Sequence, residues 1–172
     1  MPRLFVAIDF PASVKGQLSA LCADVPDAHW VDPDKFHLTL RFIGAVEEPT
    51  AAGIAEALQR IEVPAFALTL AGVGHFREHS LWVGVEQSPS LLRLQAEIER
   101  VLQQIGLSAE PRPYVPHVKL ARLRHRRGLR AFLDVHANFR AEPFEVRQFS
   151  LIESHPADRG TRYEHKADYE LI

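Results

Sequence analysis

Two stretches of the chain repeat one pattern: residues 36–44 read FHLTLRFIG, and residues 116–123 read PHVKLARL. In each stretch a histidine, His37 or His117, is followed by an apolar residue, a polar residue and a leucine. Apolar and polar residues that alternate over four to eight positions are typical of a β-strand with one buried face. The repeat therefore predicts two similar strands, one in each half of the chain.

Side chains of a strand point to alternate faces, so each predicted strand has one polar row and one apolar row. The polar rows are His37, Thr39 and Arg41 in the first strand and His117, Lys119 and Ala121 in the second. The apolar rows are Leu38, Leu40 and Phe42, and Val118 and Leu120, with Arg122 interrupting the second row. We expect the apolar rows to face the core and the polar rows to face each other across a cleft.

The segments around these strands show helical and extended patterns in mixed order. Helices are predicted at residues 13–23, 51–61, 88–105 and 128–136, and further strands at 4–10, 66–73, 81–86, 144–152 and 162–172. Hairpin-like connections outnumber strand–helix–strand crossovers, which favours an α+β fold with antiparallel sheets. Each half contains a helix, a turn marked by proline and a strand that begins with histidine. No linker separates the halves, so residues 1–172 are predicted to form a single domain.

The 172 residues are 47% hydrophobic and 24% charged, with a formal net charge of -2. This composition is typical of a soluble globular protein and excludes the strongly basic class of nucleic-acid-binding proteins. Contact with a nucleic acid must therefore be local. One basic segment fits such a contact and fits a solvated loop equally well: Arg122, Arg124, His125, Arg126, Arg127 and Arg130.

Cys22 is the single cysteine, so the chain can form no internal disulfide bond. This fits a reducing compartment, and we expect the protein in the cytoplasm. The apolar run at residues 4–8 is shorter than the core of a signal peptide, and no segment reaches the ~20 apolar residues of a membrane span. No contact with a membrane is therefore expected.

The polar rows carry the groups that acid–base catalysis at a phosphate requires. An imidazole has an ordinary pKa of about 6.5, so it can give or take a proton near neutral pH. The hydroxyl of Thr39 and the ammonium of Lys119, with Arg41 farther along, are suited to hold the oxygens of a phosphate. A single histidine in a strand is more often a packing or surface residue. Two copies of one pattern, however, indicate a site formed by His37 and His117.

The chain resembles the 2H phosphoesterases, and in particular the RNA 2′,3′-cyclic phosphodiesterases once called 2′-5′ RNA ligases. The resemblance extends over nearly the whole chain. It rests on residues 3–9 (RLFVAID), 30–31 (WV), 36–44 (FHLTLRFIG), 81–85 (LWVGV) and 116–122 (PHVKLAR).

This resemblance implies a bilobed, pseudo-twofold α+β fold in which two antiparallel sheets line a central cleft, with the helices outside. It implies hydrolysis of an RNA or nucleoside 2′,3′-cyclic phosphate to a 2′-phosphomonoester, without a metal or another cofactor. His37 is then the proton donor and His117 the proton acceptor. Ligation of RNA ends, the reverse reaction, is expected as a side activity, and the protein is expected to be a monomer.

One position departs from the family pattern, because the second motif usually has threonine or serine where this chain has Lys119. A lysine can still donate to a phosphate oxygen, but its charge is carried on a flexible stem, whereas a threonine hydroxyl is short and fixed. We therefore expect affinity for phosphate to be retained and the alignment of the substrate to suffer.

Three aromatic residues are candidates for stacking on a nucleobase: Phe5, Trp82 and Tyr163. Each fits a packing role at least as well. His75 and His79 have the i,i+4 spacing of a helical metal site. The residues around them predict a loop, however, so no metal site is expected.

Two other functions stay compatible with the sequence. A 2H phosphoesterase can act on a different small cyclic phosphate, which only a panel of substrates distinguishes. The substituted second motif also fits a non-catalytic module that binds an RNA end or a nucleotide without turning it over.

Overall fold

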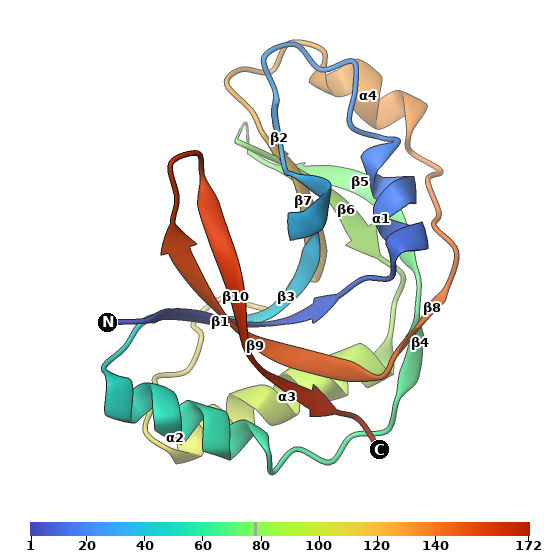
Figure 1. The fold of residues 1–172 in the computed structure, drawn as a ribbon. Helices are drawn as coiled ribbons and strands as arrows, with labels where there is room; N and C mark the ends of the chain where they lie inside the picture. The colour runs from blue at the N-terminus through green and yellow to red at the C-terminus, as the bar shows by residue number, and fades with distance from the viewer. Residues whose placement is uncertain (78) are drawn as a thin grey trace.

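The part of the chain that the structure describes forms two four-stranded antiparallel sheets and one two-stranded sheet (Figure 1). The computed structural model describes residues 1–77 and 79–172. The strands of the two larger sheets are β1 (Arg3–Asp9), β2 (His29–Trp30), β3 (His37–Ala45), β5 (Leu70–Phe76), β6 (Ser80–Val85), β7 (His117–Arg122), β9 (Gln148–Pro156) and β10 (Thr161–Glu170). The first sheet has the order β10-β9-β1-β3 and the second the order β2-β7-β6-β5. The third sheet pairs β4 (Phe66–Leu68) with β8 (Phe144–Val146).

The helices of the described residues are α1 (Ala12–Ser19), α2 (Glu48–Leu58), α3 (Pro89–Gln104), α4 (Leu129–Val135) and the 3-10 helix η1 (Pro33–Lys35). Helices α2 and α3 lie together beside the first sheet, and α1 and α4 lie on the outer side of the second sheet (Figure 1). The predicted α+β fold with antiparallel sheets and outer helices is thereby confirmed. Within the two described ranges, no helix is both long and apolar enough to cross a bilayer.

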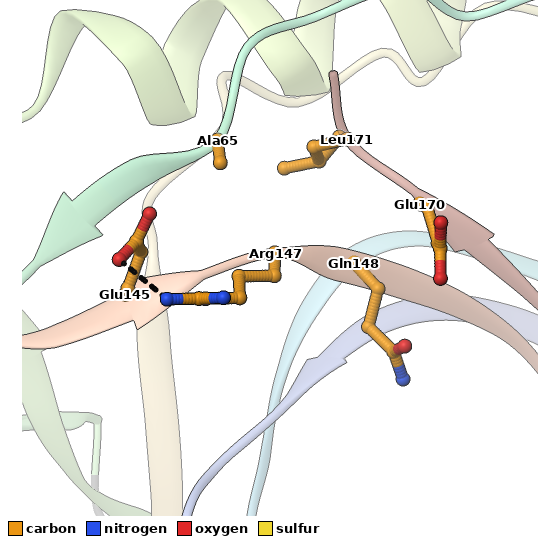
Figure 2. Close-up of a pocket in the computed structure, with 6 residues that line it drawn as sticks. All are labelled: Ala65, Glu145, Arg147, Gln148, Glu170 and Leu171. Atoms are coloured by element: carbon orange, nitrogen blue, oxygen red, sulfur yellow. Dashed lines mark hydrogen bonds and ion pairs between the residues drawn. The ribbon is translucent and has the colours of Figure 1, made fainter.

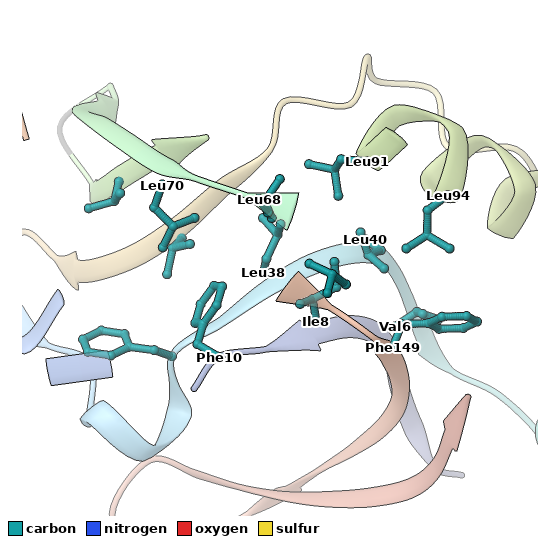
Figure 3. Packing of buried hydrophobic residues seen from close by; sticks show 14 of the residues in the cluster. Val6, Ile8, Phe10, Leu38, Leu40, Leu68, Leu70, Leu91, Leu94 and Phe149 are labelled. Atoms are coloured by element: carbon teal, nitrogen blue, oxygen red, sulfur yellow. The ribbon is translucent and has the colours of Figure 1, made fainter. Parts of the chain in front are cut away.

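The longest helix, α3, follows directly from its sequence. Ser88 caps it by accepting a hydrogen bond from the backbone N–H of Leu91 at 3.1 Å, and Pro89 occupies the first turn, where its missing N–H costs no helical hydrogen bond. Leu91 and Leu94 are at most 1% exposed. Figure 3 shows both leucines beside Leu40 of β3. The apolar side of the helix therefore packs on the apolar row of the first motif strand.

Two predicted strands are each divided between two sheets. The prediction of one strand over residues 66–73 is wrong, because β4 ends at Leu68 and pairs with β8, whereas β5 begins at Leu70 and pairs with β6. The predicted strand 144–152 divides in the same way into β8 and β9. The predicted hairpin is confirmed as β5 and β6, but its predicted loop at residues 74–79 is too long, because β5 continues to Phe76. Position 78 of its predicted loop lies outside the described residues.

Each motif strand contains a β-bulge at the leucine that ends its motif. The pairing of β3 with β1 skips Leu40, and the pairing of β7 with β6 skips Leu120. Such an extra residue shifts the alternation of side chains by one position. The predicted rows are therefore wrong beyond the bulge: Arg41 turns inward and is 9% exposed, whereas Phe42 turns outward and is 53% exposed. Arg122, also exposed, is the counterpart of Phe42 in the second strand.

Candidate active site

His37 opens β3 and is held by two hydrogen bonds. Its Nδ1 donates to the backbone carbonyl of Lys35 at 2.7 Å, and its Nε2 lies 3.1 Å from the hydroxyl oxygen of Thr39. Lys35 belongs to η1, which is capped by Asp32, whose side chain accepts a hydrogen bond from the backbone N–H of Asp34. The capped turn thus positions the carbonyl that orients the imidazole.

His117 opens β7 in the same way. Its Nδ1 donates to the backbone carbonyl of Val115 at 2.7 Å. In both strands the acceptor is the carbonyl two positions before the histidine. Because a carbonyl can only accept, each Nδ1 carries a proton, and each neutral ring presents an unprotonated Nε2. The two motifs therefore offer equivalent nitrogen atoms for proton transfer.

Aromatic packing buries much of the His37 ring. The ring centroid lies 4.9 Å from that of Phe5 and 5.4 Å from that of Tyr163. This burial lowers the pKa of His37, although the carbonyl of Lys35 and the carboxylate of Asp9 act in the opposite direction by favouring the charged ring. The neutral imidazole is therefore favoured in the free protein.

Phe76 and Trp82 flank the ring of His117, at centroid distances of 4.7 Å and 6.1 Å. A Cβ atom on Gly74 of β5 would approach the indole of Trp82 to 2.4 Å, so the missing side chain at Gly74 makes room for this ring. The indole Nε1 is buried and has no hydrogen-bond partner among the described residues. Gly74 thereby determines where an aromatic ring lies next to His117.

The two motifs meet in one cleft. The hydroxyl of Tyr114, three residues before His117, donates to the backbone carbonyl of Thr39 at 2.9 Å. His117 is also one of the groups whose charge disfavours protonation of His37. Thr39 and His117 both line a groove of about 1060 Å³, whereas His37 and Lys119 are not among its lining residues. The rest of its lining includes Phe42, Phe76, Arg77, Arg112 and Tyr114.

Thr39 and Lys119 occupy equivalent positions after the two histidines. The hydroxyl of Thr39 contacts Nε2 of His37. Lys119 is exposed, follows His117 on the same row of β7 and lies opposite Trp82 of β6. Thr39 thus contacts the imidazole of its own motif, whereas Lys119 shares only its row with His117, and the role of both side chains in holding a phosphate stays a prediction.

Arg41 does not fit the predicted site. Its guanidinium forms an ion pair with Glu99 of α3 and donates to the backbone carbonyls of Phe42 at 2.6 Å and Ser108 at 2.5 Å. The bulge at Leu40 turns the side chain to the inner face of β3, where these partners are found. Arg41 also lines the groove, but these partners engage its guanidinium, which argues against the prediction that it holds a phosphate.

The aromatic residues open to the cleft differ from those predicted. Phe5 is 4% exposed and offers no free face to a base, which contradicts its predicted stacking role. Trp82 and Tyr163 are half-buried, and stacking on them stays a prediction. Phe42 and Phe76, 53% and 39% exposed, line the groove and were not among the predicted residues. Sequence patterns alone do not single them out, because the exposure of Phe42 depends on the bulge.

A second cavity, of about 450 Å³, lies apart from the motif strands. Its lining consists of Ala65, Glu145, Arg147, Gln148, Glu170 and Leu171, as Figure 2 shows. The ion pair between Arg147 and Glu145, at 3.2 Å, occupies one side of it. The described lining includes no histidine and no residue of β3 or β7, so this cavity is separate from the two-histidine motifs.

One group of side chains in the described part of the chain has the spacing of a metal site: Glu153, His155 and Glu164, whose ligand atoms lie within 4.8 Å of one another. Lys166 lies 3.4 Å from the carboxylate of Glu153 and 3.6 Å from that of Glu164, and His155 lies 3.1 Å from that of Glu164. These carboxylates therefore already have a cationic partner.

The basic segment at residues 122–130 begins at the end of β7. His125 lies 2.9 Å from the carboxylate of Asp27. The hydrogen bond from His125, together with the charges of Arg124 and Arg127, lowers the pKa of Asp27. Part of the positive charge is thus balanced, and a contact of this segment with RNA stays a prediction.

Comparison with known proteins agrees with this geometry. Residues 10–158 match the 2′-5′ RNA ligase superfamily. An RNA 2′,3′-cyclic phosphodiesterase of Aeropyrum pernix is 43% identical over 110 residues, which cover 61% of this chain and 62% of that protein, less than two thirds of its length. An RNA 2′,3′-cyclic phosphodiesterase of Thermotoga maritima is 35% identical over 133 residues, which cover 72% of this chain and 71% of that protein.

The fold is also similar to that of a solved protein. The crystal structure of Escherichia coli LigT complexed with 3′-AMP superposes with a TM-score of 0.82 at 29% sequence identity, and the match covers 99% of both chains. The sequence match and the shared fold extend over both histidine strands. The chain therefore belongs to the 2′-5′ RNA ligase superfamily.

Proposed function

We propose that the protein hydrolyses the 2′,3′-cyclic phosphate of an RNA end or of a nucleoside and leaves a 2′-phosphomonoester. The observation that carries this proposal is the equivalence of the two motif histidines, each of which begins a motif strand and has Nδ1 tied to a backbone carbonyl at 2.7 Å, which leaves Nε2 as the atom for proton transfer. Hydrolysis of a phosphodiester needs one base and one acid placed in this way. The relatives from Aeropyrum pernix and Thermotoga maritima carry the name of this activity.

In the proposed reaction His117 accepts a proton from a water molecule whose oxygen attacks the phosphorus. The bond between the phosphorus and the ribose 3′ oxygen breaks, and His37 donates a proton to that oxygen. Thr39 and Lys119 donate to the non-bridging oxygens, whose charge needs stabilisation when the phosphorus becomes five-coordinate. The product has a 2′-phosphate and a free 3′ hydroxyl. Imidazole rings make both proton transfers, so the proposed mechanism uses no metal.

His37 has to be protonated before it can donate, although burial favours its neutral ring in the free protein. The anionic phosphate of the substrate supplies an opposite charge, which favours the imidazolium. Substrate binding and protonation of His37 are therefore coupled, and the acid forms when the phosphate is in place.

The proposed partner is an RNA with a cyclic phosphate end or a cyclic nucleotide. The reverse reaction joins a 2′-phosphate to a 5′ hydroxyl, and hydrolysis dominates because water is in excess. Cys22, the single cysteine, suits a reducing compartment. We infer that the protein acts as a monomer in the cytoplasm.

Incubation of the purified protein with 2′,3′-cyclic AMP and a chelator, followed by chromatographic identification of the product, tests this proposal. We expect 2′-AMP as the product. We expect His37→Ala and His117→Ala each to lower kcat by at least ~10²-fold, the usual effect of losing a general acid or base. His136→Ala is the matched control, because the ring of His136 packs on Phe132 of α4.

Near-wild-type turnover by either cleft variant would contradict the two-histidine mechanism, and release of 3′-AMP would contradict the proposed cleavage of the bond to the 3′ oxygen. Binding of the nucleotide without turnover would favour the non-catalytic module. Turnover of another small cyclic phosphate, without turnover of 2′,3′-cyclic AMP, would show that the protein acts on a different class of substrate. Loss of turnover with the chelator would indicate a metal-dependent reaction.

A further inference from the structure

The groove at the cleft extends well beyond the two imidazoles. Its volume of about 1060 Å³ reaches the upper end of the roughly 300–1,000 Å³ range of small-ligand sites. Its lining includes Thr39 and His117 as well as Glu110 and Arg112 in the segment that leads into β7. The groove therefore has room for more of the substrate than the reacting ribose and phosphate.

Two phenylalanine side chains line this groove and remain open to solvent. Phe76, 39% exposed, meets the ring of His117 edge-on at 4.7 Å, next to the reacting group. Phe42, 53% exposed, lies three residues beyond Thr39, which is roughly 10 Å along a strand. A nucleobase stacks on an aromatic face with little dependence on its identity. The two rings are therefore placed to take two successive bases.

The charges along the groove favour a second phosphate. Arg41 forms an ion pair with Glu99, and Arg112 forms one with Glu110, which leaves Arg77 as the uncompensated charge among the described arginine and glutamate residues of the lining. The Arg112 side chain is 87% exposed and lies 3.4 Å from Glu110. A nucleoside cyclic phosphate has its one phosphate at the imidazoles. The net positive charge along the groove therefore suits the next phosphodiester of a longer chain.

We propose that the groove binds the nucleotide that precedes the cyclic phosphate end, with its base on Phe42 and the connecting phosphodiester near Arg77. Phe76 takes the base of the reacting nucleotide. This inference rests on the proposed function and extends it, because the preferred substrate becomes an RNA chain of at least two nucleotides rather than a free cyclic nucleotide.

The test compares kcat/KM for adenosine 2′,3′-cyclic phosphate with kcat/KM for the dinucleotide that ends in the same group. The wild-type protein should favour the dinucleotide. The preference is the kcat/KM for the dinucleotide divided by the kcat/KM for adenosine 2′,3′-cyclic phosphate. Phe42→Ala should lower this ratio by roughly five- to a hundredfold, the effect of losing one stacked base. Phe42→Leu keeps an apolar side chain without an aromatic face and should lower the ratio as well. Phe42→Tyr should retain it.

Leu92→Ala is the matched control, because Leu92 is a 47% exposed apolar residue of α3 that does not line the groove. It should leave both rates unchanged. Thermal unfolding establishes that each variant is folded. A wild-type ratio near one, or the same ratio in Phe42→Ala, would overturn the inference while the proposed function stands. A wild-type protein that hydrolyses neither substrate would overturn the proposed function itself.

Discussion

The side chain at position 119 determines how the phosphate oxygens are held on the second strand. Lys119 is exposed on the row of β7 that begins with His117. Its charge attracts a phosphate, but its long stem fixes the donor less well than a threonine hydroxyl would. We therefore expect Lys119→Thr to raise KM, because a cation is lost, and to retain or raise kcat. Steady-state kinetics with 2′,3′-cyclic AMP measures both constants.

Lys119→Met is the control for this prediction, since methionine keeps an unbranched stem without charge or donor. It should raise KM without any gain in kcat. Complete loss of turnover in Lys119→Thr would show that the lysine takes a direct part in the reaction.

Proton donation by His37 predicts a pH dependence of definite sign. Burial lowers the pKa of His37 below its ordinary value of 6.5 in the free protein. Because the donor must be protonated, kcat/KM should decline as the pH rises through this lowered pKa. The bound phosphate raises the pKa, so the corresponding decline in kcat should lie at higher pH. The pH profiles of kcat and kcat/KM for one substrate measure the two declines. If both declines fell at the same pH, substrate binding and protonation of His37 would not be coupled.

The repeated motifs correctly predict two similar strands, because His37 and His117 each begin a strand with buried residues after the histidine. Arg41 and Phe42 exchange sides, because the pairing of β3 with β1 adds Leu40 as an extra residue. A bulge depends on the pairing of two strands rather than on the local pattern of either. Residues beyond it are therefore assigned to the wrong face when the sequence is considered alone.

Helix α3 illustrates what local sequence determines at the scale of elements. The range predicted for it, 88–105, agrees with Pro89–Gln104 to within one residue at each end, because a serine cap and a regular apolar spacing mark it. The strand predicted at 66–73 is divided, because β4 pairs with β8, a strand far away in the chain. Such distant partners leave no local signal.

Gly74 of β5 provides a prediction about the packing of an element. A Cβ atom there would lie 2.4 Å from the indole of Trp82, so Gly74→Ala forces the ring to move. Overpacking of this kind costs about 1–3 kcal/mol of unfolding free energy. We also expect a lower kcat, because Trp82 packs beside His117. Denaturant unfolding and steady-state kinetics measure the two effects.

Gly53→Ala is the matched control for Gly74→Ala. Gly53 lies within α2, and a Cβ atom there meets no atom within 4 Å. Alanine in a helix interior should stabilise the protein by roughly 0.5–1 kcal/mol and leave kcat unchanged. Equal stability of Gly74→Ala and the wild-type protein would show that the indole adapts without cost.

At the scale of the whole molecule, contacts between residues distant in the chain join the two halves. Tyr114 bonds to the carbonyl of Thr39, and Arg41 bonds to Glu99 and to the carbonyl of Ser108. These contacts hold β3 against α3 and against the segment that leads into β7. We propose that residues 1–172 therefore act as one bilobed unit, with the spacing of the two histidines maintained by both halves.

Buried ionisable groups in this unit predict how its stability depends on pH. Between the lowered pKa of His37 and 6.5 the unfolded chain binds more protons than the folded chain, so stability should fall as the pH drops below 6.5. Burial acts to raise the pKa of Glu99, but hydrogen bonds from Gln103 and Arg41 outweigh it and lower the pKa. The stability that Glu99 contributes is therefore lost as the pH falls below 4.5. The free energy of unfolding should decline in two stages between pH 7 and pH ~3.

Glu99→Gln isolates the second of these stages. It removes the carboxylate partner of Arg41, whose side chain is 9% exposed, and should cost on the order of 2 kcal/mol at pH 7. The decline below pH 4.5 should become shallower, because the titrating group is gone. Glu97→Gln on the same helix breaks an ion pair with Arg100 in which both side chains are at least 33% exposed, so it should change stability much less. If denaturant unfolding gave Glu99→Gln the stability and acid response of the wild-type protein, the contact between β3 and α3 would not depend on this ion pair.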